Sequence, residues 1–174
     1  MLISKKMNAA INEQIGNEFE ASLQYVAIAS HFAGDGLTAL AGHFYRQAEE
    51  ERTHAMRFVH YVADAGGNVE IPTIPAPRAS FKNVADAVRL ALNHELNVTS
   101  QINGLVDLAL KESDHISRDI LSWFVREQLE EVSSMDSLLK VVQRAGETNL
   151  IHVEDYITRL EGKTAKMEAE AKGN

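Results

Sequence analysis

The sequence predicts an all-α protein: a four-helix bundle with a long crossover between its second and third helices and a short fifth helix towards the C-terminus. Three observations support this prediction. In four long segments, apolar residues recur at alternating steps of three and four, the spacing of one face of an α-helix. Turn residues divide these segments into two pairs. All three prolines lie between Pro72 and Pro77, so the segment that joins the pairs cannot be helical throughout.

The first pair is expected to form a hairpin of helices, one from about Lys5 to Phe32 and one from about Leu37 to Ala65. Gly34-Asp35-Gly36 ends the first helix, because glycine readily adopts the left-handed conformations of a tight turn. Gly66-Gly67 ends the second helix. Each helix has an apolar stripe with polar residues near its middle. The stripes are Ile11, Ile15, Glu18, Ser22, Tyr25, Ala29 and Phe32, and then Leu37, Leu40, Phe44, Gln47, Glu51, His54, Phe58 and Val62.

Residues 68 to 82 are expected to form an extended connection. At roughly 3.3 Å per residue, this segment can run the length of a long helix. It therefore allows the second pair of helices to start at the opposite end of the bundle from the first pair, which is the arrangement of bundles with one long crossover.

The second pair of helices is expected to begin near Asn83, a suitable N-cap, and to turn at Lys111-Glu112-Ser113-Asp114. Its second helix should run to about Ala145, where Gly146 stops it, and a fifth helix should follow from about Asn149 to Leu160. We expect residues 1–162 to form one domain and the polar tail 163–174 to be disordered. The stripes are Val84, Val88, Ala91, Glu95, Val98, Ile102, Leu105 and Ala109, and then Ser117, Leu121, Phe124, Gln128, Glu131, Met135, Leu138 and Val142.

The polar residues of the four stripes are expected to lie at one level of the bundle. In an antiparallel hairpin, two residues face each other when they are equally far from the turn. Glu18 and Glu51 lie 17 and 16 residues from the aspartate of the first turn. Glu95 lies 17 residues from the glutamate of the second turn, and Gln128 and Glu131 lie 16 and 19 residues from it. At 1.5 Å per residue, these mismatches are about one helical turn or less.

A group of buried carboxylates needs compensation. For any single glutamate, pairing with Lys or Arg would be the ordinary explanation, but the stripes contain neither residue near this level. Unpaired buried charges would cost several kcal/mol each. Two divalent cations would neutralise four carboxylates, and a set of carboxylates with one imidazole suits iron or manganese. The expected ligands are Glu18, Glu51, His54, Glu95 and Glu131.

The composition is consistent with a cation-binding protein. The 174-residue chain has 17 Lys and Arg against 25 Asp and Glu, a net charge of −8, which disfavours non-specific binding to nucleic acid. It contains no cysteine, so thiolate metal sites and thiol catalysis are excluded. The N-terminal residues lack the apolar core of a signal peptide, and no segment approaches a membrane span. We therefore expect a cytoplasmic protein that binds neither nucleic acid nor membranes.

With these residues in place, the chain resembles a bacterial non-haem ferritin of the ferritin-like di-iron family, over roughly residues 5 to 160. The resemblance implies a hollow homo-oligomeric cage of two dozen subunits that oxidises Fe(II) with O2 or hydrogen peroxide at a dinuclear centre within each bundle. Ferric mineral is then stored in the cavity. The residues that carry the resemblance are Asn17-Glu18, Tyr25, Glu50-Glu51-Arg52-Thr53-His54, Glu95, and Trp123 followed by Glu127-Gln128-Leu129-Glu130-Glu131.

The resemblance also implies roles for individual residues. The first iron site would comprise Glu18, Glu51 and His54. The second would comprise Glu95 and Glu131, with Glu51 bridging and Gln128 close by; this site lacks a histidine because Gln128-x-x-Glu131 stands where a second Glu-x-x-His would be. Tyr25 would hydrogen-bond a ligand or donate an electron, or else be an ordinary core tyrosine. A third, weaker iron site would use Glu50, Glu127 and Glu130, which could equally form a solvated helix face.

Three related classes fit the sequence less well. Bacterioferritins carry a methionine haem ligand where this chain has Arg52, so no haem is expected. The DNA-protecting mini-ferritins build their iron site between subunits and are smaller. A di-iron oxidase or peroxidase of the rubrerythrin kind, which does not store iron, is the main alternative. Such proteins often have cysteine-bound iron, and this chain has no cysteine. Arg118 and Leu121 occupy the acidic three-fold channel positions of animal ferritins, so iron is expected to enter by another route.

Overall fold

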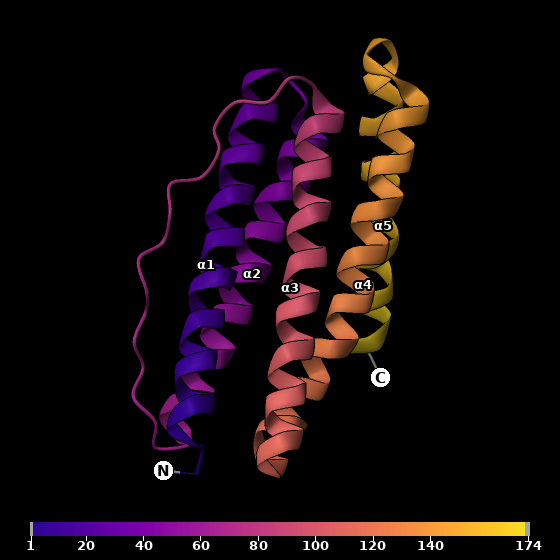
Figure 1. The fold of residues 1–174 in the computed structure, drawn as a ribbon. Helices are drawn as coiled ribbons and strands as arrows, with labels where there is room; N and C mark the ends of the chain where they lie inside the picture. The colour runs from indigo at the N-terminus through magenta and orange to yellow at the C-terminus, as the bar shows by residue number, and fades with distance from the viewer. Residues whose placement is uncertain (1, 173–174) are drawn as a thin grey trace.

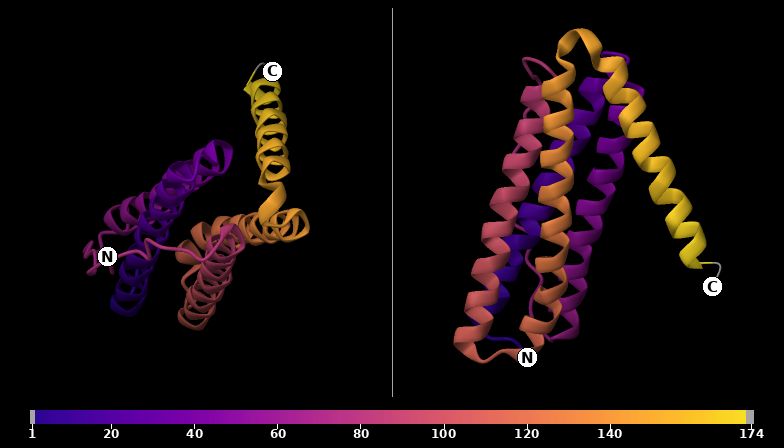
Figure 2. Two further views of the ribbon diagram at one scale, coloured as in Figure 1. Left: turned by 90° about the horizontal axis from the view of Figure 1, so that it is seen from above. Right: turned by 90° about the vertical axis from the view of Figure 1, so that its right-hand side faces the viewer.

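Four long helices lie in two antiparallel pairs, and a fifth helix leaves the end of the bundle at an angle (Figures 1 and 2). The computed structural model describes the backbone of residues 2–172 and the side chains of residues 2–162. Within these residues it contains helices and no strands, which confirms the predicted all-α class. The elements are α1 (Lys5–Gly34), α2 (Thr38–Asp64), α3 (Val84–Glu112), α4 (His115–Ala145), the 3-10 turn η1 (Glu147–Asn149) and α5 (Leu150–Lys172).

The helix ends follow the local sequence signals. Asn83 caps α3, because its side-chain oxygen accepts a hydrogen bond of 2.8 Å from the backbone N–H of Asp86. Asp114 caps α4 in the same way, at 2.9 Å from the N–H of Ser117. Gly36 in the first turn has a φ of 78°, a left-handed conformation that glycine adopts without strain. The turns predicted from these residues are therefore confirmed.

Helix α2 begins without a cap of its own, since Leu37 at its N-cap offers no side-chain acceptor. Glu154 of α5 supplies one instead. Its two carboxylate oxygens accept hydrogen bonds from the backbone N–H groups of Ala39 and Leu40, at 2.9 and 2.8 Å. A carboxylate at a helix N-terminus also interacts favourably with the helix dipole. This contact fixes the start of α5 against the start of α2.

The connection between α2 and α3 runs along α1 in extended form (Figure 1). Side chains of α1 attach it near both of its ends. Asn12 donates to the backbone oxygen of Asn68 at 2.8 Å, and Gln24 exchanges two hydrogen bonds of 2.9 and 2.8 Å with the backbone of Arg78. Between them, Pro72 lies so close to Gly16 that a Cβ at Gly16 would come within 2.3 Å of the proline ring. The predicted crossover is confirmed, and it is anchored along its length.

The core consists of two apolar clusters with a polar layer between them. One cluster surrounds Phe32 and Phe44, and the other surrounds Phe58 and Phe124. The predicted stripes are buried throughout, except for Leu37 and Gln47, which are half-buried. The polar layer is therefore enclosed on both sides by packed apolar side chains.

The fifth helix is longer than predicted. It was expected to end near Leu160, but it continues to Lys172. Its first half packs against the bundle through Val153 and Ile157, which are fully buried. Residues 173–174 of the expected polar tail lie outside the described residues, and the proposed domain boundary at 162 remains a prediction. None of the helices among the described residues combines the length and apolar character needed to cross a membrane.

Candidate metal centre

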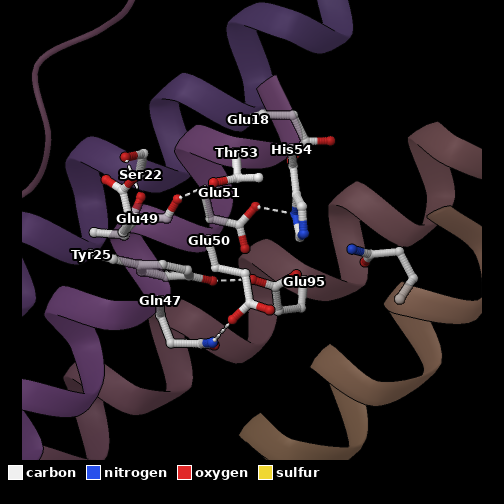
Figure 3. Close-up of polar contacts among 12 residues, drawn as sticks. Glu18, Ser22, Tyr25, Gln47, Glu49, Glu50, Glu51, Thr53, His54 and Glu95 are labelled. Carbon is white, nitrogen blue, oxygen red and sulfur yellow. Dashed lines mark hydrogen bonds and ion pairs between the residues drawn. The ribbon is translucent and has the colours of Figure 1, made fainter. Parts of the chain in front are cut away.

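The polar layer brings side chains from all four long helices to one level of the bundle. Glu18 comes from α1, Glu51 and His54 from α2, Glu95 from α3, and Gln128 and Glu131 from α4. All six are buried, and the three glutamates of the first three helices have no exposed surface at all. Figure 3 shows Glu51 and Glu95 pointing into the space between the helices. The register predicted from the distances to the two turns is thus observed.

These side chains form two groups that could each hold a metal ion. In the first group, ligand atoms of Glu18, Glu51 and His54 all lie within 4.8 Å of one another. In the second, ligand atoms of Glu51, Glu95 and Glu131 do so. Glu51 belongs to both groups. A carboxylate with two oxygens can bridge two neighbouring cations, so the arrangement is that of a dinuclear site.

The hydrogen bonds around the centre satisfy only part of its polar atoms. In the centre, three buried carboxylate oxygens have no hydrogen-bond partner within the described part of the chain: Oε2 of Glu18, Oε1 of Glu51 and Oε2 of Glu95. A buried polar atom without a partner costs about 1–3 kcal/mol, so three in one place are unusual. Carboxylate oxygens beside one imidazole are suitable ligands for hard to borderline divalent cations. The residues present therefore fit a pair of such cations.

Two neighbouring side chains hold individual ligands in place. Gln14, one turn before Glu18 on α1, donates a hydrogen bond of 2.9 Å to its Oε1. Tyr25 donates a short hydrogen bond from its hydroxyl group to Oε1 of Glu95 (Figure 3). The expectation that Tyr25 hydrogen-bonds a ligand is confirmed. Gln14 was not predicted, although its i,i+4 spacing from Glu18 on the same helix was a usable signal.

The carboxyl groups of the centre all have raised pKa values. Burial is the main cause, because it disfavours the charged form. The neighbouring charge of Glu51 raises the pKa of Glu18 further, although the Gln14 hydrogen bond opposes this rise. Burial raises the pKa of Glu95, against hydrogen bonds from Tyr25 and Gln128. Burial together with Glu51 and Glu95 raises the pKa of Glu131 to about 10. Cations that bind here therefore displace protons.

A third group lies beside the centre. Ligand atoms of Glu50, His54, Glu127 and Glu131 lie within 4.8 Å of one another. Glu50 and Glu127 are half-buried and line an open pocket of about 330 Å³, here called the acidic pocket, together with Glu49 and His54. Glu130, the third residue expected in this group, is exposed and is not brought into it. Its part in a third iron site remains a prediction.

His54 is also held by aromatic rings. The Trp123 ring meets it edge-on with 5.4 Å between centroids, and the Phe124 ring does so at 5.9 Å. The guanidinium of Arg57 lies 4.0 Å from the centroid of Trp123 on its outer side. These contacts restrict the orientation of the imidazole. They agree with a packing role for Trp123.

Comparisons with known proteins point in one direction. The Ferritin-like domain family matches residues 8–145, which include the four long helices apart from the first three residues of α1. "Ferritin BfrB" of Mycolicibacterium smegmatis is 46% identical over 157 residues, covering 90% of this chain and 86% of the relative. A "Bacterial non-heme ferritin" of Staphylococcus haemolyticus is 31% identical over 146 residues, covering 84% and 88%. An open-pore ferritin of Archaeoglobus fulgidus has a similar structure, with a TM-score of 0.87, 31% identity, and coverage of 90% of this chain and 96% of that one.

Proposed function

This chain belongs to the bacterial ferritin family, and on that premise we propose that it oxidises Fe(II) at the dinuclear centre and stores the ferric product. The substrates are Fe(II) and an oxidant, either O2 or hydrogen peroxide. Two Fe(II) ions give up one electron each. O2 accepts these two electrons and two protons to become hydrogen peroxide; peroxide accepts two electrons and two protons to become two molecules of water.

The observation that carries this proposal is the position of Glu51 in both groups of buried ligands. A shared carboxylate holds two ions close enough for one oxidant molecule to take an electron from each. The remaining carboxylates favour the product, because Fe(III) carries more positive charge than Fe(II) and interacts more strongly with anions in a buried site. Ions that enter displace the protons of the carboxyl groups, so the centre stays close to neutral as it fills.

The two ions are not held equally. His54 belongs to the first group, and the second group has carboxylates only, with the Gln128 amide nearby. We therefore propose that the two sites differ in affinity. We propose that Glu50 and Glu127 form a third, weaker iron site beside the centre, in the acidic pocket, and that Glu130 is a further candidate ligand of this site.

The similarity to solved ferritins, one with an open pore and one engineered into a closed form, supports a homo-oligomeric assembly for this chain. We propose a 24-subunit cage in the cytoplasm. Arg52 is exposed and pairs with Glu49 on the surface of α2, at 2.6 Å. Because position 52 is an arginine, a haem bound through a methionine at this position would lack its ligand in this chain.

The test is aerobic addition of Fe(II) to purified metal-free protein, followed by absorbance of the ferric product and by sizing of the protein. Rapid oxidation with iron that stays soluble inside a large assembly is the expected result. Oxidation by a small oligomer whose iron precipitates would instead indicate a di-iron oxidase or peroxidase of the rubrerythrin type. A rate no faster than in buffer would contradict both functions.

A further inference from the structure

A second pocket borders the metal centre from another side. It lies between α3 and α4 and has a volume of about 410 Å³. Its walls are mainly apolar, and three polar side chains, Thr99, Asn103 and Gln128, contribute to its lining. We call it the α3–α4 groove and define it by Leu96, Val125, Leu129 and Val132 with Thr99 and Gln128. The acidic pocket, in contrast, is lined by the three carboxylates of Glu49, Glu50 and Glu127, with His54 and one cation, Arg57.

One side chain separates the α3–α4 groove from the second metal group. Gln128 lines the groove but is only 3% exposed. Its amide oxygen accepts a hydrogen bond of 2.9 Å from the Thr99 hydroxyl group, and its side chain also hydrogen-bonds Glu95. The same hydroxyl group lies 2.8 Å from the backbone oxygen of Glu95, so its single hydrogen is shared between these two acceptors. The Gln128–Thr99 pair thus closes the inner end of the groove at a ligand of the centre.

The two pockets suit different substrates. A ferrous ion is a hydrated dication, and moving it along apolar walls would remove water that those walls cannot replace. Carboxylates attract it and raise its local concentration, so the acidic pocket suits it. Dioxygen is small, uncharged and apolar, and it loses nothing by entering an apolar groove. Hydrogen peroxide is polar and hydrogen-bonds with carboxylates and water, so it does not need the groove.

We propose that the α3–α4 groove is the path by which dioxygen reaches the second metal group, with the Gln128–Thr99 pair as its inner gate. This proposal rests on the proposed ferroxidase function. It predicts that narrowing the groove slows oxidation by O2 and leaves binding of metal ions unchanged. It also predicts that oxidation by hydrogen peroxide is unaffected, because peroxide reaches the centre from the polar side.

Two valines allow a matched test. Val125 lines the groove and is 43% exposed, whereas Val26 on α1 is 41% exposed and lies outside it. Val125→Trp would fill the mouth of the groove, and Val26→Trp adds the same side chain elsewhere. Val132→Phe narrows the groove at a half-buried position, and Val132→Ala widens it. Each assembled protein is loaded anaerobically with Fe(II) and mixed in a stopped-flow instrument with buffer at several O2 concentrations.

The measured quantity is the second-order rate constant for O2. We expect it to fall about tenfold in Val125→Trp and Val132→Phe, equivalent to about 1.4 kcal/mol of barrier, to stay at the parent value in Val26→Trp, and not to fall in Val132→Ala. The rate with hydrogen peroxide and the stoichiometry of Co(II) binding should not change. Equal O2 constants in all variants, or a parallel loss with O2 and peroxide, would overturn the proposal.

Two further outcomes are informative. Failure of Val125→Trp alone to form the parent assembly would show that the groove is a subunit contact, which also overturns the proposal. Absence of O2-dependent oxidation in the parent protein would contradict the ferroxidase function itself. The two failures are therefore distinguishable. Failure of the path proposal is seen by comparing variants with the parent, whereas failure of the ferroxidase function is seen in the parent protein itself.

Discussion

The two metal groups share Glu51 but differ in everything else that holds them. The first group has an imidazole, which aromatic rings orient, and a carboxylate that Gln14 fixes. The second group has only carboxylates. Tyr25 donates a hydrogen bond to one of them, Glu95, and Glu131 has no hydrogen bond among the described contacts. Both occupy the same level of the same bundle. Helix register therefore places both groups at one level of the bundle, whereas single side chains make the two groups chemically different.

The largest effect is expected from the residue that both groups share. Glu51→Ala should reduce the initial rate of Fe(II) oxidation at least about a hundredfold, because it removes a ligand from each ion at once. The cage should still assemble, since Glu51 is enclosed within its own subunit. The matched control is Asp64→Ala, at an exposed position on the same helix that lies in neither the acidic pocket nor the α3–α4 groove.

Stopped-flow absorbance and size-exclusion chromatography would check this prediction. The control should oxidise iron at the parent rate. If Glu51→Ala retained the parent rate, the shared carboxylate would not bridge two ions, and the comparison between the two groups would lose its basis.

Removing a ligand of the second group that the first group does not share should abolish one metal site of the centre and leave the other. Glu131→Gln keeps the size of the side chain but weakens the second group, so calorimetric titration of the metal-free protein with Zn(II) should show one tight site per subunit instead of two. The remaining site should be that of Glu18, Glu51 and His54. Glu130→Gln, at the exposed neighbouring position, is the control and should retain both sites. Loss of both sites in Glu131→Gln would mean that the groups do not bind independently.

Glu131 is buried beside other carboxyl groups, so the stability of the metal-free protein should depend on pH. The folded carboxyl group keeps its proton to about pH 10, whereas the unfolded one loses it near its ordinary pKa of 4.5. Between these values the folded state binds more protons, so stability falls as pH rises, by up to about 1.4 kcal/mol per pH unit for each proton. Below pH 4.5 this contribution is fully present.

Glu131→Gln removes that dependence without changing the packing. Thermal unfolding of metal-free protein between pH 6 and pH 9 should therefore show a melting temperature that decreases less steeply in Glu131→Gln than in the parent, and that is higher at pH 8. Saturating Zn(II) should stabilise the parent more than the variant, because the metal replaces the protons. Parallel curves for the two metal-free proteins would show that Glu131 is ionised in the folded state.

Most of the fold and of the centre was predictable, because both follow from helical periodicity and distance to a turn. Glu18, Glu51, Glu95 and Glu131 interrupt apolar stripes, and a buried carboxylate is conspicuous in such a setting. The length of α5 was not predictable in the same way. Its continuation to Lys172 follows no apolar stripe, and polar segments with helix-forming residues give no signal for where a helix ends.

Contacts between elements were the other gap. Glu154 caps α2 from more than a hundred residues away, and Thr99 of α3 donates a hydrogen bond to Gln128 of α4. Neither pair has a periodic relation in the sequence, so only the packed structure reveals them. Glu130 shows the opposite case: it belongs to a run of acidic residues on α4, but its place on the helix turns it towards solvent.

The smallest effects are expected from the side chains that support each group without belonging to it. Gln14→Leu removes the hydrogen bond to Glu18, and Tyr25→Phe removes the one to Glu95. Loss of such a supporting contact costs about tenfold or somewhat more in metal affinity. Gln14→Leu should therefore weaken the first Zn(II) site and Tyr25→Phe the second, each leaving the other site at the parent affinity. Two-site calorimetric titration of both variants measures this directly. If both substitutions weakened the same site, Glu18 and Glu95 would serve one ion together, and the division of the centre into a histidine half and a carboxylate half would be wrong.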